Sequence, residues 1–252
     1  MTVRTGVAGW NIPAGSAHRF PERGSHLTRY ASALPCVEIN SSFYRSHRRL
    51  TYERWAASTA ESFRFAIKCP RSITHEHRLH RVGALLSGFL GEIAGLGRRR
   101  GPILVQLPPS FAFDSRLAER FFITLRSEDD GQVVCEPRHS TWFSAEAEAL
   151  MRRHQIARVV ADPPSGPAAE SPAGWPGVTY FRLHGSPRRY WSRYEPVRLR
   201  TWADTIHHQR AEADVWCIFD NTAAGAAVEN AFEFQAMMAG ARLDSPSSQP
   251  SR

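Results

Sequence analysis

Short apolar runs recur along the chain, and stretches with apolar residues at helical spacing separate them. Eight runs rich in β-branched and aromatic residues have the length of buried strands, at 3–10, 36–43, 63–69, 102–108, 132–138, 156–162, 178–185 and 215–221. Amphipathic stretches lie between them, for example at 82–96, 116–126 and 144–154. Continuous apolar strands that alternate with helices are typical of parallel strands whose outer face is covered.

Eight strand–helix units in 252 residues predict a single (β/α)8 barrel of the triosephosphate isomerase (TIM) type, with a polar pocket at the C-terminal face of the strands. An open, doubly wound sheet is the alternative, but no G-x-G-x-x-G motif follows any run. We expect one domain over residues 1–240 and a disordered, polar tail over 241–252. Residues 163–177, rich in proline, glycine and alanine, replace the helix expected after the sixth strand and predict a long loop able to act as a lid.

Polar residues gather at the C-terminal ends of the predicted strands, which converge on one face of such a barrel. Side chains two positions apart share a face of a strand, so Glu136 and Arg138 point into the same mouth. A salt bridge from Glu136 to Arg138 or Arg182, holding the barrel top together, is the structural alternative. The residues at these ends are Trp10, Glu38, Asn40, Tyr44, Lys68, Gln106, Glu136, Arg138, Asp162, Arg182, His184, Asp220 and Asn221.

Lys68 is the only lysine among 32 lysine and arginine residues. A lysine is a compact charge whose pKa falls readily on burial, so it can serve as an acid, a base or an anion anchor. Burial would lower its pKa and a nearby carboxylate would raise it, which leaves the net direction open. We assign acid–base or anchoring work to Lys68, Glu136 and His184, with a Schiff base on Lys68 as an alternative.

The segment "RLHGSPRRYWSRY" follows the seventh strand, where barrels often bind phosphate. Its arginines and tyrosines suit an anion and stacked bases, or else the tyrosines plug the mouth. The predicted substrate-binding residues are Trp10, Glu38, Asn40, Tyr44, His75, Gln106, Arg138, Trp142, Arg182, Tyr190, Tyr194 and Asn221. Core packing is the alternative for the two tryptophans, and Tyr30, Tyr52 and Tyr180 are assigned to packing.

A divalent metal is the cofactor that the strand ends could hold. Asp162 and Asp220, with Glu136 and His184, come from four consecutive strands and could surround a cation. Only His184 is a histidine inside a strand end, and the stretch "THEHRLH" lacks the H-E-x-x-H spacing of zinc proteases. Hydrogen bonding is therefore the alternative role for His184.

The formal net charge of +8 and the pI near 9.9 favour an anionic partner, with a small ligand first and nucleic acid as an alternative. No apolar run is long enough to span a membrane, and the first residues do not resemble a signal peptide, so we expect a cytoplasmic protein without a membrane partner. The four cysteines form no C-x-x-C pair and sit in apolar runs, which predicts buried thiols and no disulfide-linked partner.

Six stretches together resemble the YecE-like family of bacterial and archaeal proteins: "VEINSSFYR", "FRFAIKCPRSITH", "ILVQLPPSF", "CEPRHSTWF", "YFRLHGSPRRYWSRY" and "FDNTAAGAAVENA". The resemblance spans residues 3–238 and implies a TIM-type barrel, in a domain of unknown function. Relatives often carry a second Trp-Gly after the first "GW", and residues 11–20 depart from that pattern.

The function expected from these features is an enzyme acting on a phosphorylated or nucleic-acid-derived substrate at the barrel mouth. By fold analogy, a metal-dependent hydrolase, nuclease or isomerase of the endonuclease IV and xylose isomerase type is one alternative. A non-catalytic protein that binds the same kind of ligand is the other. Strand-end residues that satisfy one another completely, with no open pocket, would argue against an enzyme.

Overall fold

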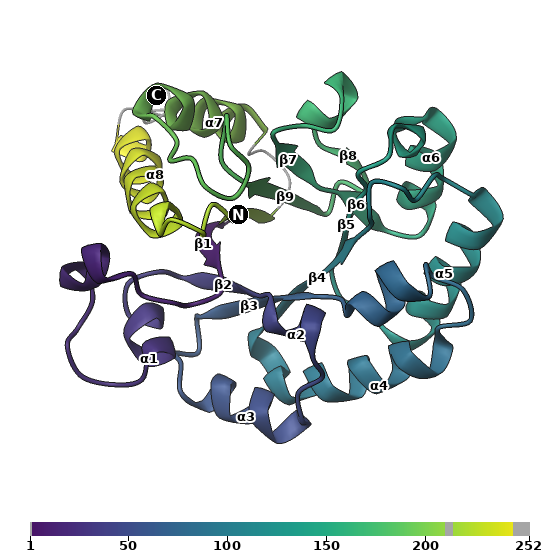
Figure 1. Cartoon of the computed structure of the whole chain (residues 1–252), viewed down its shortest axis with the longest axis horizontal. Helices are drawn as coiled ribbons and strands as arrows, with labels where there is room; N and C mark the ends of the chain where they lie inside the picture. The colour runs from purple at the N-terminus through teal and green to yellow at the C-terminus, as the bar shows by residue number, and fades with distance from the viewer. Residues whose placement is uncertain (1, 210–213, 244–252) are drawn as a thin grey trace, which may run out of the picture.

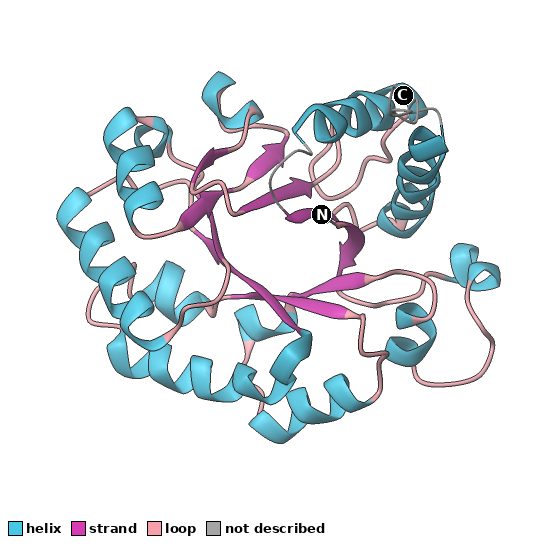
Figure 2. Ribbon diagram, turned by 180° about the vertical axis from the view of Figure 1, so that it is seen from behind, coloured by secondary structure: helices cyan, strands magenta, loops and turns pink. Residues whose placement is uncertain are grey.

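One strongly curled sheet forms the centre of the fold, and the helices lie on its outer side (Figures 1 and 2). The computed structural model describes residues 2–209 and 214–243. Its strands are β1 (Val3–Ala8), β2 (Cys36–Ile39), β3 (Arg64–Lys68), β4 (Arg100–Gln106), β5 (Val133–Glu136), β6 (Ile156–Arg158), β7 (Val160–Asp162), β8 (Ala173–Gly174), β9 (Val178–Leu183) and β10 (Asp214–Phe219).

Helices follow most strands and begin where the sequence supplies a cap. Asp114 accepts a hydrogen bond from the backbone of Leu117, and Ser144 accepts one from Ala147, which satisfies free amides at two helix starts. The α-helices are α1 (His26–Ala31), α2 (Ser41–Tyr44), α3 (Arg49–Ala57), α4 (Gly83–Ile93), α5 (Ser115–Glu128), α6 (Ala145–Arg153), α7 (Pro196–Gln209) and α8 (Ala226–Leu243). The short helices are η1 (Ala14–Arg19), the π-helical η2 (Ser72–Glu76), η3 (Ala94–Arg99), η4 (Ser140–Phe143) and η5 (Pro167–Glu170).

The strand order is β7-β9-β10-β1-β2-β3-β4-β5-β6-β8, and all neighbours are parallel except β6 and β8. The predicted strand 156–162 is interrupted at Val159, because its first half, β6, pairs with β5 and its second half, β7, pairs with β9. The predicted α/β fold class is therefore confirmed, with mostly parallel strands in one curled sheet. A complete (β/α)8 barrel is not confirmed.

The segment 163–177 is more ordered than a plain loop. It contains η5 and the two-residue strand β8, which pairs antiparallel with β6 through Ala157 and Gly174. This pairing covers an edge that β6 would otherwise leave open. The segment thus contributes a short strand to the sheet. The sequence had predicted only a loop, because the segment lacks a helical pattern.

Side chains alternate between two packing layers along each strand, as expected for period-two geometry. One buried cluster consists of strand residues that face one another inside the curl, including Ala66, Leu104, Val134 and Ile218. The larger cluster lies between the sheet and the helices and takes alternate positions, such as Phe65 and Ile67. The inward-facing residues of each strand therefore form a layer separate from the outer core. The residues that continue this inner layer are the ones found at the C-terminal end of the sheet.

All four cysteines are buried free thiols, as predicted. Within residues 2–209 and 214–243, no helix combines the length and the apolar character needed to cross a bilayer. The tail was expected to begin at 241, but α8 continues to Leu243. Residues 244–252 lie outside the described part of the chain.

Tyr30 joins two strands through its hydroxyl group. The hydroxyl accepts a hydrogen bond from the backbone of Val7 at 2.9 Å and donates one to the carbonyl of Cys36 at 2.8 Å. We predict that Tyr30→Phe lowers the free energy of unfolding by about 1–3 kcal/mol, because two buried backbone groups lose their partner. Urea denaturation should show this loss, while Tyr44→Phe, at a side chain that is 71% exposed, should change stability by less than about 0.5 kcal/mol.

Candidate functional site

Polar side chains replace the inner apolar row where the strands end. Lys68 follows Ala66 on β3, Gln106 follows Leu104 on β4, and Glu136 follows Val134 on β5. Arg182 follows Tyr180 on β9, and Asp220 follows Ile218 just beyond β10. The period-two rule therefore brings together residues that lie up to 152 positions apart in the sequence, Lys68 and Asp220.

Arg182 lies at the centre of this layer with no exposed surface. Its Nε and Nη2 donate to the two carboxylate oxygens of Glu38 at 3.0 and 2.7 Å. Nη1 donates to Glu136 Oε2 at 2.6 Å, and Nη2 also donates to Asp220 Oδ2 at 2.8 Å. Three carboxylates from three strands thus surround one guanidinium. We call Arg182, Glu38, Glu136 and Asp220 the Arg182 cluster.

His184 bridges two members of the Arg182 cluster. Its Nδ1 lies 3.0 Å from Asp220 Oδ2, and its Nε2 lies 3.0 Å from Glu136 Oε1. Both ring nitrogens therefore lie within hydrogen-bond distance of a carboxylate oxygen. His184 and Arg182 were predicted to hold an anionic substrate, but their polar atoms already face carboxylates.

Two neutral side chains complete the hydrogen bonding. Gln106 Nε2 donates to Glu136 Oε2, and the Tyr180 hydroxyl donates to Glu38 Oε2, both at 2.9 Å. Tyr180 was assigned to packing from the sequence, and its hydroxyl belongs to this network as well. Gln106 was expected to donate to a substrate, but its amide contacts Glu136 instead.

The buried charges stabilise one another's ionised forms. Burial alone would raise the pKa of Glu136, but Arg182, His184 and Arg138 hold it well below its usual range. The pKa of Asp220 is lowered in the same way against its burial, chiefly by Arg182. Burial opposes the charge of Arg182, yet Glu38 and Glu136 raise its pKa well above the ordinary value. The salt-bridge interpretation of Glu136 therefore describes what this residue does in the structure.

Lys68 is the exception among the strand-end charges. It is 7% exposed, and it makes no ion pair with any carboxylate among the described residues. Its Nζ lies 4.2 Å from the ring centroid of Phe43, which stabilises a cation from one side. Burial and then the charge of Arg182 lower the pKa of Lys68 to about 8, against the opposite pull of Glu38, Asp220 and Glu136. Lys68 is thus a desolvated cation that the fold leaves without a paired anion.

The surroundings of His75, on the rim beside Lys68, are positively charged. Burial lowers the pKa of His75, and the nearby charges of Lys68 and Arg138 lower it further. Arg71 and Arg78 act in the same direction. Since these four charges are all positive, this part of the rim favours an anion.

Tyr190 and Arg138 lie above the Arg182 cluster. Arg138 donates to Glu136 Oε1 and to the Tyr190 hydroxyl, at 3.2 and 3.0 Å. The Tyr190 ring packs edge-on against His184 with the centroids 5.4 Å apart, and its backbone has a φ of 69°, a left-handed value that is uncommon for a tyrosine. Tyr190 covers His184, which agrees with a tyrosine closing part of the mouth.

The other predicted binding residues lie around this centre. Tyr194 and Asn221 stabilise the loop after β9. The Tyr194 hydroxyl accepts a hydrogen bond from the backbone of Gly185 and donates one to the carbonyl of Asp162. Asn221 donates to Ser192 and Asn230. Trp10 packs on Trp55 at a centroid distance of 4.9 Å. Asn40 precedes α2, and its buried Oδ1 has no hydrogen-bond partner in the described structure.

Trp142 does not line the mouth. It is 1% exposed, and its indole nitrogen donates to the carbonyl of Phe111 at 2.9 Å. The core-packing alternative therefore describes Trp142, and no feature of the sequence separates this role from that of a pocket wall.

The residues predicted to ligate a metal are engaged elsewhere. Asp162 receives a hydrogen bond from Arg198 at 2.7 Å, and Asp220 is bound by Arg182 and His184. No group of three histidine, cysteine, aspartate or glutamate side chains within residues 2–209 and 214–243 is arranged as a metal site. The guanidinium of Arg182 lies where the carboxylates converge, so the residues present do not fit a divalent cation there.

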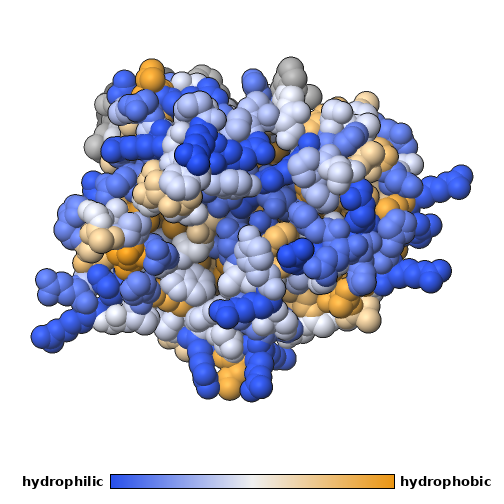
Figure 3. Space-filling view, in the orientation of Figure 1, coloured by the Kyte–Doolittle hydropathy of each residue, from blue (hydrophilic) through white to orange (hydrophobic). Residues whose placement is uncertain are grey.

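Phe43 also belongs to this site although it was not predicted, since its ring contacts both Lys68 and His75. Its position in "NSSFYR", directly after the second strand, was the available signal. Phe43 and the neighbouring Tyr44 also line a cavity of about 400 Å³ that reaches Leu85 and Phe89 on α4. A second cavity of about 240 Å³ lies between the end of β1 and the start of α8. Figure 3 shows mainly hydrophilic surface, with small separate hydrophobic areas, on the face of the molecule drawn there.

Residues 4–252 match the family model described as "Protein of unknown function DUF72". The chain belongs to this family. It is 32% identical over 141 residues to the UPF0759 protein YecE of Escherichia coli K12, covering 54% of this chain and about half (52%) of that protein. It is 23% identical over 260 residues to the UPF0759 protein YunF of Bacillus subtilis 168, covering 90% of this chain and 92% of that protein.

Solved structures show the same fold. The DUF72 family protein EF0366 of Enterococcus faecalis V583 superposes with a TM-score of 0.80 at 22% identity, covering 100% of this chain and 99% of that one. The DUF72 protein TM1631 of Thermotoga maritima gives 0.79 at 24% identity, covering 95% and 100%. An L-ribulose 3-epimerase gives 0.55 at 13% identity, covering 99% and 100%, which places the DUF72 fold near TIM-barrel-like proteins.

The Arg182 cluster predicts a large stability effect. Arg182→Met should lower the free energy of unfolding by about 3–5 kcal/mol at pH 7, because three buried carboxylates lose their shared cation. The loss should shrink toward pH 5, where the unpaired carboxylates can take up protons. Urea denaturation at both pH values measures this, and Arg193→Met, at an exposed arginine paired with Glu233, is the control expected to change stability by about 1 kcal/mol or less. A loss as small as that of the control would contradict a central role for Arg182.

Proposed function

We propose that the C-terminal end of the sheet binds a small organic anion, with Lys68 as its anchor and as the group that transfers a proton. One observation carries this proposal: Lys68 is the desolvated cation of the mouth that has no paired carboxylate among the described residues. An incoming phosphate or carboxylate would supply the missing charge. The positive surroundings of His75 favour the same kind of ligand.

The ionisation of the carboxylates limits which residues can transfer a proton. Glu136 and Asp220 have their pKa held low by Arg182 and His184, so neither is suited to accept a proton near neutral pH. Lys68, with its pKa near 8, exchanges a proton readily at that pH. A reaction at this site would therefore use Lys68 for proton transfer and the Arg182 cluster as a rigid support. A protein that binds the anion without turnover is the competing function, since most strand-end residues satisfy one another.

We also propose that the sheet closes into a (β/α)8 ring through the short break at Val159. Val159 alone separates β6 from β7, and its backbone donates to the carbonyl of Cys135 on β5 at 2.8 Å. The chain therefore stops pairing with β5 and begins to pair with β9 within one residue. In a closed ring, Glu136 and Arg182, which are in direct contact, belong to a single mouth.

Replacement of Lys68 tests the anion site directly. A thermal-shift screen of sugar phosphates, nucleoside monophosphates, small carboxylates and a short DNA, with and without a chelator, identifies a ligand by the rise in the unfolding midpoint. We predict that Lys68→Arg abolishes the shift with small anions while its own midpoint stays near that of the unmodified protein. Arg116→Lys, on the exposed side of α5, should keep the shift. A shift with DNA alone, or one that needs a metal, would contradict the proposal.

The depressed pKa of Lys68 predicts how stability depends on pH. Between pH 8 and the ordinary lysine value of 10.5, the unfolded chain holds a proton that the folded chain has released, so stability rises with pH. Lys68→Met removes the buried charge and should raise the free energy of unfolding by about 1–3 kcal/mol below pH 8. The gain should fade as the pH approaches 10.5. Denaturant unfolding of both proteins at pH 7 and pH 10 measures this, and an equal difference at both values would contradict it.

A further inference from the structure

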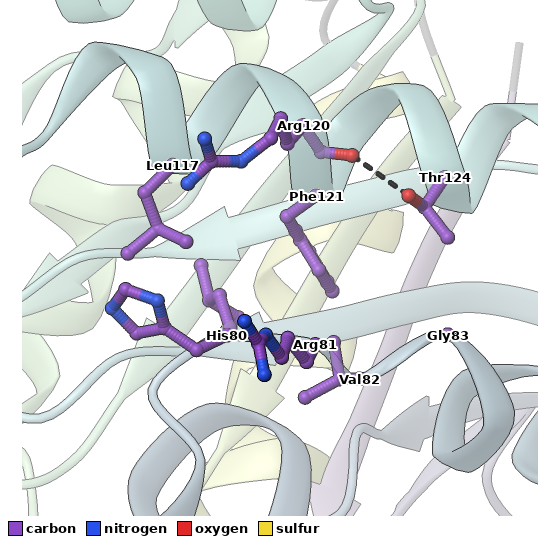
Figure 4. Close-up of a pocket in the computed structure, with 9 residues that line it drawn as sticks. His80, Arg81, Val82, Gly83, Leu117, Arg120, Phe121 and Thr124 are labelled. Carbon is purple, nitrogen blue, oxygen red and sulfur yellow. Dashed lines mark hydrogen bonds between the residues drawn. The ribbon is translucent and has the colours of Figure 1, made fainter.

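A cavity of about 440 Å³ lies in the helical layer outside the sheet, between the residues that precede α4 and one side of α5 (Figure 4). Its volume falls in the range of small-molecule sites. Val82, Leu117 and Phe121 form its apolar part, and all three are buried. His80, Arg81 and Arg120 also line it, and these three are exposed.

The charges of this cavity have one sign. No aspartate or glutamate lines it, while Arg81 and Arg120 approach from its two sides, the connecting segment and α5 (Figure 4). Neither guanidinium makes an ion pair or a hydrogen bond within residues 2–209 and 214–243, in contrast to Arg153, which pairs with Glu119. Two unpaired arginines above an apolar floor suit an anion, because a guanidinium binds carboxylate or phosphate through two parallel hydrogen bonds.

The backbone around Arg81 has an unusual conformation. Arg78, Leu79 and Arg81 have φ values of 48°, 65° and 51°, in the left-handed region that such residues rarely adopt. Arg78 is held away from the cavity, since it donates to the carbonyl and the hydroxyl group of Ser110 and stacks on Phe111. A strained but well-anchored turn thus presents Arg81 beside the apolar floor.

We propose that this cavity binds an amphipathic organic anion, a carboxylate with an aliphatic or aromatic body, separately from the Lys68 site. The apolar body would lie on Val82, Leu117 and Phe121, and the carboxylate would lie between Arg81 and Arg120. The floor distinguishes this ligand from inorganic phosphate, which has no apolar part to bury. The positive rim distinguishes it from neutral or cationic molecules of the same shape.

Titration calorimetry of the full chain with octanoate tests the proposal. We expect octanoate to bind and the double variant Arg81→Met/Arg120→Met to weaken its affinity at least tenfold. Arg116→Met removes the same charge from the same helix outside the cavity, and it should change the affinity less than twofold. Octanol and octylamine should not bind measurably, because they lack the negative charge.

The proposal would be overturned if octanoate did not bind, if octanol or octylamine bound as well, if Arg116→Met weakened binding equally, if the double variant kept its affinity, or if inorganic phosphate competed as well as octanoate. Lys68→Met provides the last control. It should leave octanoate binding unchanged, and a loss there would place the anion at the C-terminal end of the sheet instead. All substituted arginines are exposed, so the variants should fold.

Discussion

The C-terminal end of the sheet depends on one arginine that three carboxylates surround. Removing four charges from water is expensive, and only close, well-aligned contacts offset that expense. Arg182 achieves this by using its Nε and both terminal nitrogens on Glu38, Glu136 and Asp220. These residues come from β2, β5, β9 and the end of β10, so the cluster also fixes how the strand ends lie relative to one another.

This arrangement determines which residues remain available for a ligand. Groups that look catalytic in the sequence, such as Glu136 and His184, have their polar atoms satisfied by their neighbours. Lys68 shares the same inner layer but lies over Phe43 without an anionic partner in the described structure. The pKa of Lys68 is lowered, whereas that of Arg182 is raised. A lysine gives up its charge on burial far more readily than an arginine does.

Many of the polar residues at the C-terminal end of the sheet could be predicted, because the direction of a strand side chain depends only on its position along the strand. A residue two positions after an inner apolar residue also points inward, so Glu136 and Arg182 could be placed at the mouth from the sequence. The pairing of Glu136 with Arg182 was one of the alternatives, but the pairing of Arg182 with Glu38 was not foreseen, because these two residues are separated by 144 positions and meet only in the folded sheet. The break at Val159 was equally hidden, since nothing in the order of residues 156–162 separates the half that pairs with β5 from the half that pairs with β9. In the sequence, a tryptophan in a pocket wall and a tryptophan in the core look the same. Only the hydrogen bond from Trp142 to Phe111 in the folded structure shows that Trp142 belongs to the core.

The most direct test uses the fact that Lys68 is the only lysine. Protein labelled with carbon-13 at the lysine side chain gives a single side-chain Cε resonance, so its NMR titration needs no assignment. We predict a midpoint near pH 8 for the free protein, and a higher midpoint when an anion is bound, because the added negative charge favours the protonated form. A midpoint near the ordinary lysine value of 10.5, unchanged by any anion, would contradict the claim that Lys68 is a buried cation awaiting a partner.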